Sequence, residues 1–266
     1  MPANQPPALW VGRLLRAGTT GFIAGCAVTQ FDAPSLGALV RAPVEENYTV
    51  YGLIYDIHID DDGLVRQLVT SENVSDEIMK DNRERRIVPV EMSVLSVGYE
   101  QNGKIQHLLP PRPPLSLDRI FLCTAAELVR FTETGHFGYF RHILRAKDTP
   151  LGEILAAHIQ QAGLAHTEQF AKQIVGTFHT ELMGTFHTER FANIVPTPAL
   201  ASGAIRRFAK QIANRVPWQS REQIVGTIHG VNGEQWKEAA TRELITLLRD
   251  DYPTLMSVLG ALGEIQ

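Results

Sequence analysis

Short segments of strand-forming residues, separated by turn signals, dominate the sequence from Leu9 to about Leu109. The clearest is Tyr48–Ile59, which is rich in β-branched and aromatic residues and leads into the hairpin-turn residues Asp60–Gly63. Further strands are expected at Trp10–Arg16, Phe22–Gln30, Leu36–Pro43, Leu64–Val69, Ile87–Glu100, Lys104–Leu109 and Ser116–Cys123, with Pro43 ending its strand. Many short strands in so short a stretch predict a small closed β-barrel, because closure removes the exposed edges of a sheet.

Helical patterns replace the strand patterns in the second part of the chain. Thr124 and Glu127 have the spacing of a capping box for a helix over Thr124–Thr132. Further helices are expected at Leu151–Ala162, Thr167–Ile174, Ala204–Arg215, Gly233–Asp250 and Tyr252–Leu262. One of them has a predicted buried face made by Trp236, Ala239, Ala240, Leu244, Leu247 and Leu248. The expected fold class is α+β, with a disordered arm at 1–8, a small β-barrel domain at 9–123 and a mainly α-helical domain at 124–266.

The composition is that of a globular protein, with 44% hydrophobic and 20% charged residues. The formal net charge of −4 argues against a broad nucleic-acid-binding surface. Cys26 and Cys123 are too few for a disulfide framework and fit a reducing compartment. The first residues lack a signal-peptide pattern, and no apolar run approaches the roughly 20 residues of a membrane helix. We therefore expect a cytoplasmic protein without membrane contact.

The sequence contains no motif that predicts a catalytic residue, a cofactor or a bound metal. Gly98–Lys104 fits the start of a phosphate-binding loop, but Ile105 stands where the magnesium-binding hydroxyl belongs. The Asn-Gly pair inside this segment favours a hairpin between two strands instead. His179 and His187 each begin a His-Thr-Glu triplet, whereas a zinc-hydrolase helix places its histidines at i and i+4 around a glutamate. We therefore interpret both histidines as ordinary polar residues.

Two basic clusters are candidate contacts for phosphates or for an acidic partner. Arg83, Arg85 and Arg86 lie in the polar stretch between two predicted strands. The second cluster decorates the expected basic helix at 204–216 and consists of Arg206, Arg207, Lys210 and Arg215. The competing interpretation is a solvated surface, because acidic residues balance the basic ones in both halves of the chain.

Three segments, Val11–Arg16, Gly37–Arg41 and Tyr51–Ile57, match a first strand, a mid-barrel strand and the next strand in one known kind of barrel. In these segments the chain resembles the HAS-barrel, the small β-barrel shared by HerA-type DNA translocases and rotary ATP synthases. Pro110–Phe131 and Thr149–Ile154 are similar to the segments on the C-terminal side of the barrel in HerA-type proteins. Beyond them the chain lacks the phosphate-binding glycines, lysine and hydroxyl residue of such an ATPase.

The resemblance implies a role in assembly, because the barrels of those ATPases contact one another around a ring. We expect a non-catalytic accessory protein whose barrel mediates homo- or hetero-oligomerisation, or docking to a HerA-type DNA-processing ATPase or an associated nuclease. One alternative is a nucleic-acid-binding module that contacts DNA through the basic helix 204–216, which predicts binding that weakens with salt. Another is a metal-dependent hydrolase that uses the His-Thr-Glu triplets, which predicts bound metal in the purified protein.

Overall fold

The computed structural model describes residues 9–28, 34–59, 75, 88–147, 149–183 and 233–264. The strands are β1 (Trp10–Ala17), β2 (Gly21–Val28), β3 (Leu39–Glu45), β4 (Tyr48–Ile59), β5 (Val88–Gln101), β6 (Lys104–Gln106) and β7 (Arg119–Leu122). The helices are α3 (Ala125–Glu133), the 3₁₀ helix η1 (Thr134–Phe137), α4 (Phe140–Leu144), α5 (Leu151–Met183), α8 (Gly233–Leu247) and α9 (Tyr252–Glu264). The predicted α+β class, a β-barrel followed by helices, is confirmed.

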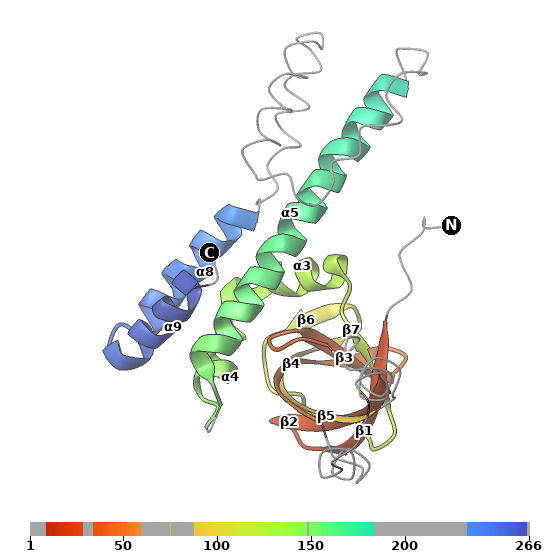
Figure 1. Ribbon diagram of the computed structural model, residues 1–266. Helices are drawn as coiled ribbons and strands as arrows, with labels where there is room; N and C mark the ends of the chain where they lie inside the picture. The colour runs from red at the N-terminus through yellow and green to blue at the C-terminus, as the bar shows by residue number, and fades with distance from the viewer. Residues whose placement is uncertain are drawn as a thin grey trace. The chain divides into compact units, whose positions relative to one another are not determined.

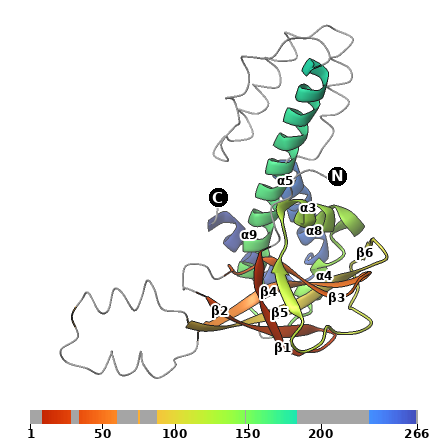
Figure 2. The ribbon, with the colours of Figure 1, turned by 90° about the vertical axis from the view of Figure 1, so that its right-hand side faces the viewer.

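Six of the strands close into an antiparallel barrel. The order is β2-β1-β7-β3-β4-β5, and β5 closes the ring by pairing with β2 from Leu95 and Gly21 to Val88 and Val28. Strand β6 adds only to β5, as the second arm of a hairpin. Figures 1 and 2 show the ring from two directions. The barrel core is made of buried side chains that include Leu14, Phe22, Val40, Val50, Ile54, Met92, Val94 and Ile120.

Most predicted strands that fall on described residues are found, but their ends differ. Lys104–Leu109 was expected to be a strand, whereas β6 ends at Gln106. The prediction that Pro43 ends its strand is wrong, since β3 continues through it to Glu45. On one side of β3, β7 pairs only with Val40 and Arg41, so within the described residues that side is unpaired at Pro43. A proline is tolerated in a strand where one side needs no N–H donor.

The predicted segments around Asp60–Gly63 and Leu64–Val69 lie outside the described residues. The hairpin predicted at the Asn-Gly pair is confirmed, because it joins β5 to β6. Asn102 has φ 51° and Gly103 has φ 77°, the two positive values that a tight type I′ turn requires.

The predicted capping box of α3 is present. The Glu127 N–H donates to Thr124 Oγ1 at 3.3 Å, and the Thr124 N–H donates to Glu127 Oε2 at 2.8 Å. These bonds satisfy two donors that the first turn of a helix leaves without intrahelical partners. Glu127 also forms an ion pair with Arg41 of β3, with 2.8 Å between Nε and Oε1. Thus the cap that starts the helix also holds it against the barrel.

The prediction of separate helices at Leu151–Ala162 and Thr167–Ile174 is wrong, because both segments belong to α5. Gly163, between them, costs a helix only about 1 kcal/mol relative to alanine. It is explained by close packing, since a Cβ at this position would lie 2.4 Å from Cε of Lys237 in α8. The glycine therefore permits contact between two helices and does not end one.

The chain divides into two compact units, Met1–His158 with Leu247–Gln266, and Ile159–Thr246. The predicted buried face of α8 is confirmed at Trp236, Ala240 and Leu244, and Leu248, directly after the helix, is also buried as predicted. Ala239 and Leu247 were expected on that face but are exposed. Within the described ranges, no helix is both long enough and apolar enough to cross a membrane.

Candidate partner-binding surfaces of the barrel

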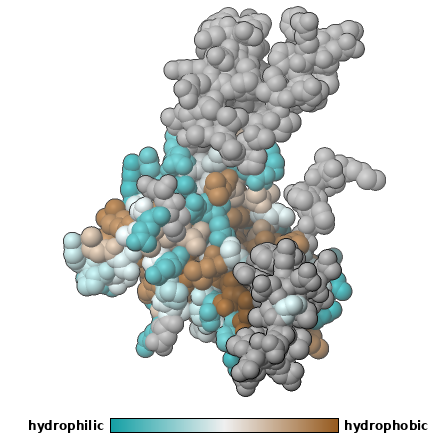
Figure 3. Space-filling model, in the orientation of Figure 1, coloured by the Kyte–Doolittle hydropathy of each residue, from teal (hydrophilic) through white to brown (hydrophobic). Residues whose placement is uncertain are grey.

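Five large hydrophobic side chains are exposed along β1 and the chain beside it. Leu9 precedes β1, Trp10 and Leu15 belong to it, and Leu115 and Leu117 lie in the segment before β7. Their exposed fractions range from 48% at Leu15 to 69% at Leu117. We call these five residues the apolar strip. In Figure 3, hydrophobic residues reach the surface beside hydrophilic ones. Isolated exposed leucines are common on proteins, whereas groups of large exposed apolar side chains are characteristic of binding surfaces.

Backbone hydrogen bonds fix the segment before β7 against β1. The Leu117 N–H donates to the Leu14 carbonyl at 2.8 Å, and the Leu14 N–H donates to the Asp118 carbonyl at 2.9 Å. The Arg13 guanidinium donates to the Leu117 carbonyl at 2.9 Å. The Asp118 carboxylate accepts from the Leu115 N–H at 2.8 Å. The apolar strip is therefore carried by a backbone that is hydrogen-bonded on both sides of Leu117.

Leu117 has a strained backbone. Its φ is 72°, in the left-handed region that favours glycine or asparagine. A residue with a bulkier side chain costs of order 1–3 kcal/mol there. The side chain regains little of this cost, because 69% of the residue is exposed. Within the described residues, neither backbone preference nor burial of the side chain explains a leucine at this position.

A polar network joins α3 to β4 and β5. Arg130 donates to both carboxylate oxygens of Glu100, from Nη1 to Oε1 at 2.8 Å and from Nη2 to Oε2 at 2.5 Å. The Tyr51 hydroxyl donates to Glu100 Oε2 at 2.8 Å. Hydrogen bonding from Arg130 lowers the pKa of Glu100, and burial raises the pKa of Tyr51. Glu100 is thus a paired carboxylate at neutral pH, which suits a structural link between helix and barrel better than a general base.

Two buried histidines are part of the packing in the same unit. His158 Nδ1–H donates to the Gly37 carbonyl at 3.1 Å, and its Nε2 accepts from the Tyr139 hydroxyl at 3.0 Å. Burial lowers the pKa of His158 to about 4. His107 packs on Phe131, with 4.7 Å between ring centroids, and burial lowers the pKa of His107 to about 4 as well. Both rings are therefore neutral at pH 7.

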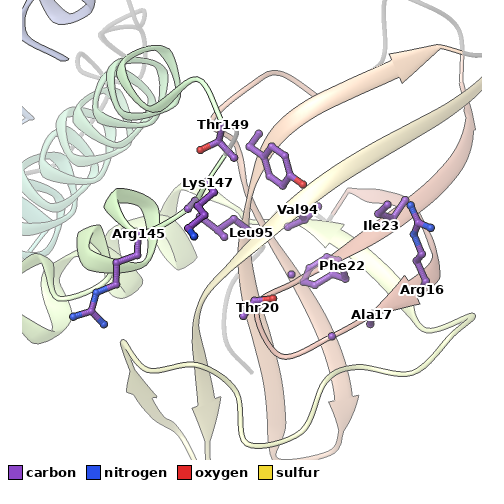
Figure 4. Close-up of a pocket in the computed structure, with 14 residues that line it drawn as sticks. Arg16, Ala17, Thr20, Phe22, Ile23, Val94, Leu95, Arg145, Lys147 and Thr149 are labelled. Carbon is purple, nitrogen blue, oxygen red and sulfur yellow. The ribbon is translucent and has the colours of Figure 1, made fainter. Parts of the chain in front are cut away.

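A groove of about 630 Å³ lies between the β1–β2 hairpin, strand β5 and the segment after α4. Arg16, Arg145 and Lys147 are its basic lining residues, and the half-buried Ile23 and Leu95 are among its apolar ones. Figure 4 shows Lys147 and Arg145 on one side and Arg16 on the other, with Phe22 and Val94 between them. The groove can therefore offer both positive charge and apolar surface to one ligand.

The basic residues predicted as contacts all lie outside the described residues, so the nucleic-acid-binding alternative stays a prediction. They are Arg83, Arg85, Arg86, Arg206, Arg207, Lys210 and Arg215. Of the histidines in the two triplets, His179 lies in α5 and His187 lies outside the described residues. In the part of the chain that the structure describes, no three His, Cys, Asp or Glu residues are grouped to hold a metal ion. The hydrolase alternative also stays a prediction.

Sequence reasoning missed both the apolar strip and the groove. Leu115 and Leu117 alternate with Ser116, a pattern that predicts one apolar face of a strand and conceals that both leucines are exposed. The groove could not be found, because Arg16 and Lys147 are far apart in sequence and only the fold brings them together.

Comparison with known proteins adds no functional assignment to this geometry. A scan against protein-family models and a search of curated proteins both give no match for the sequence. The function of the chain therefore has to be inferred from the apolar strip, the groove and the packing around them.

Proposed function

We propose that this chain is a non-catalytic accessory protein that assembles through its β-barrel, by oligomerisation or by docking to a HerA-type DNA-processing ATPase or nuclease complex. The apolar strip is the proposed docking face. The observation that carries the proposal is Leu117, an exposed leucine held at φ 72° by hydrogen bonds to β1. A partner that covers this side chain supplies the burial that the isolated chain does not.

Trp10 suits a docking face because its polar atom is already satisfied. The indole Nε1–H donates to the Gly12 carbonyl at 3.0 Å, while 57% of the residue is exposed. Covering this ring would remove apolar surface from water without leaving a buried donor unpaired. Tryptophan is also one of the residue types most enriched among the side chains that contribute most to protein–protein affinity.

Docking at the strip has to use side chains. β1 is paired on one side with β2 and on the other with β7, and β7 is also paired with β3. Over these pairings no strand edge is free to accept an added strand, which is the other common way for a sheet to bind a partner. The closed barrel therefore favours a partner with a matching apolar surface, such as the outer wall of another barrel.

The proposed kinship with HAS-barrels is supported by where the matching segments lie. Val11–Arg16 falls in β1, Gly37–Arg41 leads into β3, and Tyr51–Ile57 falls in β4. At two positions in these segments, close packing leaves no room for a Cβ and explains why the residue is glycine. A Cβ at Gly37 would lie 2.8 Å from the backbone nitrogen of His158 in α5, and a Cβ at Gly52 would lie 2.4 Å from a Val94 methyl. These contacts explain Gly37 by close packing against α5 and Gly52 by packing inside the barrel, and the family assignment itself is part of the proposal.

The mass of the native complex tests the proposal. The purified chain is measured by native mass spectrometry, alone and mixed with a HerA-type ATPase, and compared with Trp10→Asp. We expect a homo-oligomer or a mixed complex for the wild type, and loss of that complex for Trp10→Asp. The variant should remain folded, because Trp10 is exposed and a surface substitution usually changes stability by about 0.5 kcal/mol or less.

Leu164→Asp is the matched control, since it places the same acidic residue at an exposed hydrophobic position of α5 that is not part of the strip. It should assemble like the wild type. A wild-type chain that is monomeric alone and does not bind the ATPase would contradict the proposal. A complex that persists in Trp10→Asp would show that assembly does not use the strip.

A further inference from the structure

The groove beside the β1–β2 hairpin has an excess of positive charge. Arg16, Arg145 and Lys147 line it, and no described lining residue is acidic. Within the described residues none of these three side chains is in an ion pair, whereas other exposed cations, such as Arg112 and Lys172, are paired with glutamates. Asp148, the neighbour of Lys147, lies outside the described residues. Three cations around one groove, none of them paired with a described carboxylate, favour a ligand with several negative charges.

The rest of the lining is largely apolar. Phe22 and Val94 belong to the buried barrel core, so the apolar side chains that reach the groove from β2 and β5 are the half-buried Ile23 and Leu95. The volume of about 630 Å³ falls in the range of ligand-binding pockets, about 300–1,000 Å³. A purely inorganic anion would leave this apolar surface in contact with water. The lining therefore favours a ligand that brings apolar groups together with its charges.

Thr149 adds a polar group without a partner. Its Oγ1 is buried and has no hydrogen-bond partner among the residues that the structure describes, although the residue lines the groove. An unsatisfied buried hydroxyl costs about 1–3 kcal/mol. Figure 4 shows Thr149 on the same side of the groove as Lys147. A ligand carboxylate that approaches Lys147 could accept a hydrogen bond from this hydroxyl.

We propose that this groove binds an acidic peptide segment of a partner protein, with carboxylates near Arg16, Arg145 and Lys147 and an apolar side chain against the half-buried Ile23 and Leu95. A peptide is favoured over nucleic acid for two reasons. Bases bind single-strand sites by stacking on exposed aromatic faces, but of the two aromatic lining residues Phe22 is only 3% exposed and Tyr55 is half-buried. The whole chain also has a net charge of −4, which opposes a polyanion longer than the groove. This inference does not depend on the apolar strip, because the strip and the groove use different side chains.

Fluorescence anisotropy with the full-length chain tests the inference. The probe is a fluorescein-labelled short peptide with a central Leu-Phe pair between acidic residues. We expect saturable binding that weakens when salt is raised from about 0.1 M to about 1 M, which shortens the Debye length from about 10 Å to about 3 Å. Arg145→Glu with Lys147→Glu should weaken binding about tenfold or more, since two attractions become repulsions. The neutral pair Arg145→Gln and Lys147→Gln should weaken it less.

Three controls make the result specific. Lys104→Glu reverses an exposed charge that does not line the groove and should bind the peptide like the wild type. A peptide with serines in place of the acidic residues, and another with serines in place of Leu-Phe, should each bind more weakly. Absence of binding by the acidic peptide, or equal binding by the serine peptides, would overturn the inference. Tighter binding by an oligothymidine of similar length would overturn it in favour of a nucleic-acid site.

Discussion

The Tyr139 hydroxyl lies 3.0 Å from Nε2 of His158, and this nitrogen must accept the hydrogen bond. The reason is on the other side of the ring, where Nδ1–H donates to the Gly37 carbonyl at 3.1 Å. A neutral imidazole has one donor and one acceptor nitrogen, and both are used here. His158 thereby connects Tyr139, the residue before α4, to the glycine turn that leads into β3.

This arrangement predicts that the barrel-containing unit loses stability in mild acid. Burial lowers the pKa of His158 from 6.5 to about 4, so the unfolded chain takes up a proton at a higher pH than the folded chain. The stability contributed by the neutral ring is therefore fully present above pH 6.5 and is lost as the pH falls to about 4. A shift of this size corresponds to roughly 3 kcal/mol. Urea unfolding at several pH values between 7.5 and 4.5 measures the slope of the free energy of unfolding against pH.

His158→Gln should be less stable at pH 7.5 and should lose less stability on acidification than the wild type. His107, whose pKa is also lowered by burial to about 4, leaves part of the slope in this variant. The control is His136→Asn, which removes an exposed histidine and keeps a residue that tolerates its φ of 45°. It should show the wild-type slope. An unchanged slope in His158→Gln would show that this histidine is not the titrating group.

The Arg130–Glu100–Tyr51 network predicts unequal costs for its members. Glu100→Ala should lower the free energy of unfolding by about 2 kcal/mol, because it removes the carboxylate that accepts from both the buried Tyr51 hydroxyl and the Arg130 guanidinium. Tyr51→Phe should cost about 1 kcal/mol, since it removes a hydroxyl that donates to Glu100 and accepts from Arg130 but leaves the Arg130–Glu100 pair in place. Chemical denaturation of both variants and the wild type at pH 7 measures the two losses in the free energy of unfolding. Equal losses would contradict the assignment of Glu100 as the shared acceptor.

Local signals were sufficient for some elements of this fold. Tyr48–Ile59 was predicted with both ends correct, because its β-branched and aromatic residues are bounded by turn residues at either end. The start of α3 was predicted from Thr124 and Glu127 alone, since a capping box involves only residues within one turn. In these elements the structure is determined by near neighbours in sequence.

Other features depend on neighbours that the sequence does not identify. Pro43 lies inside β3 because β7 does not extend that far along it, and Gly163 lies inside α5 because α8 packs closely there. The same limitation applies to the binding surfaces. Arg16 and Arg145 meet across a groove formed by segments distant in sequence, and Leu117 looks like a core residue until its backbone and exposure are known.

The capping box provides a further test of how α3 is held. Thr124→Ala should cost about 1 kcal/mol, the usual loss for removing an N-cap side chain. Glu127→Gln should cost a similar amount, because it keeps the length of the side chain but removes the charge that pairs with Arg41. Thermal unfolding of the two single variants and the double variant measures their coupling. Because Glu127 accepts from Thr124 Oγ1 as well as from its N–H, we expect the double variant to lose less than the sum.

Leu117→Gly separates the stability of the chain from its assembly. Glycine accepts the φ of 72° without strain, so the variant should be more stable than the wild type by about 1 kcal/mol when both are monomeric. The same change removes an exposed side chain of the apolar strip and should weaken the complex. Leu115→Gly is the matched comparison, because Leu115 is also exposed but does not have a positive φ. It should weaken assembly without the gain in stability. Thermal unfolding at low protein concentration, together with native mass spectrometry, measures both effects. A Leu117→Gly chain that is more stable and assembles normally would show that the strained leucine is not part of the docking face.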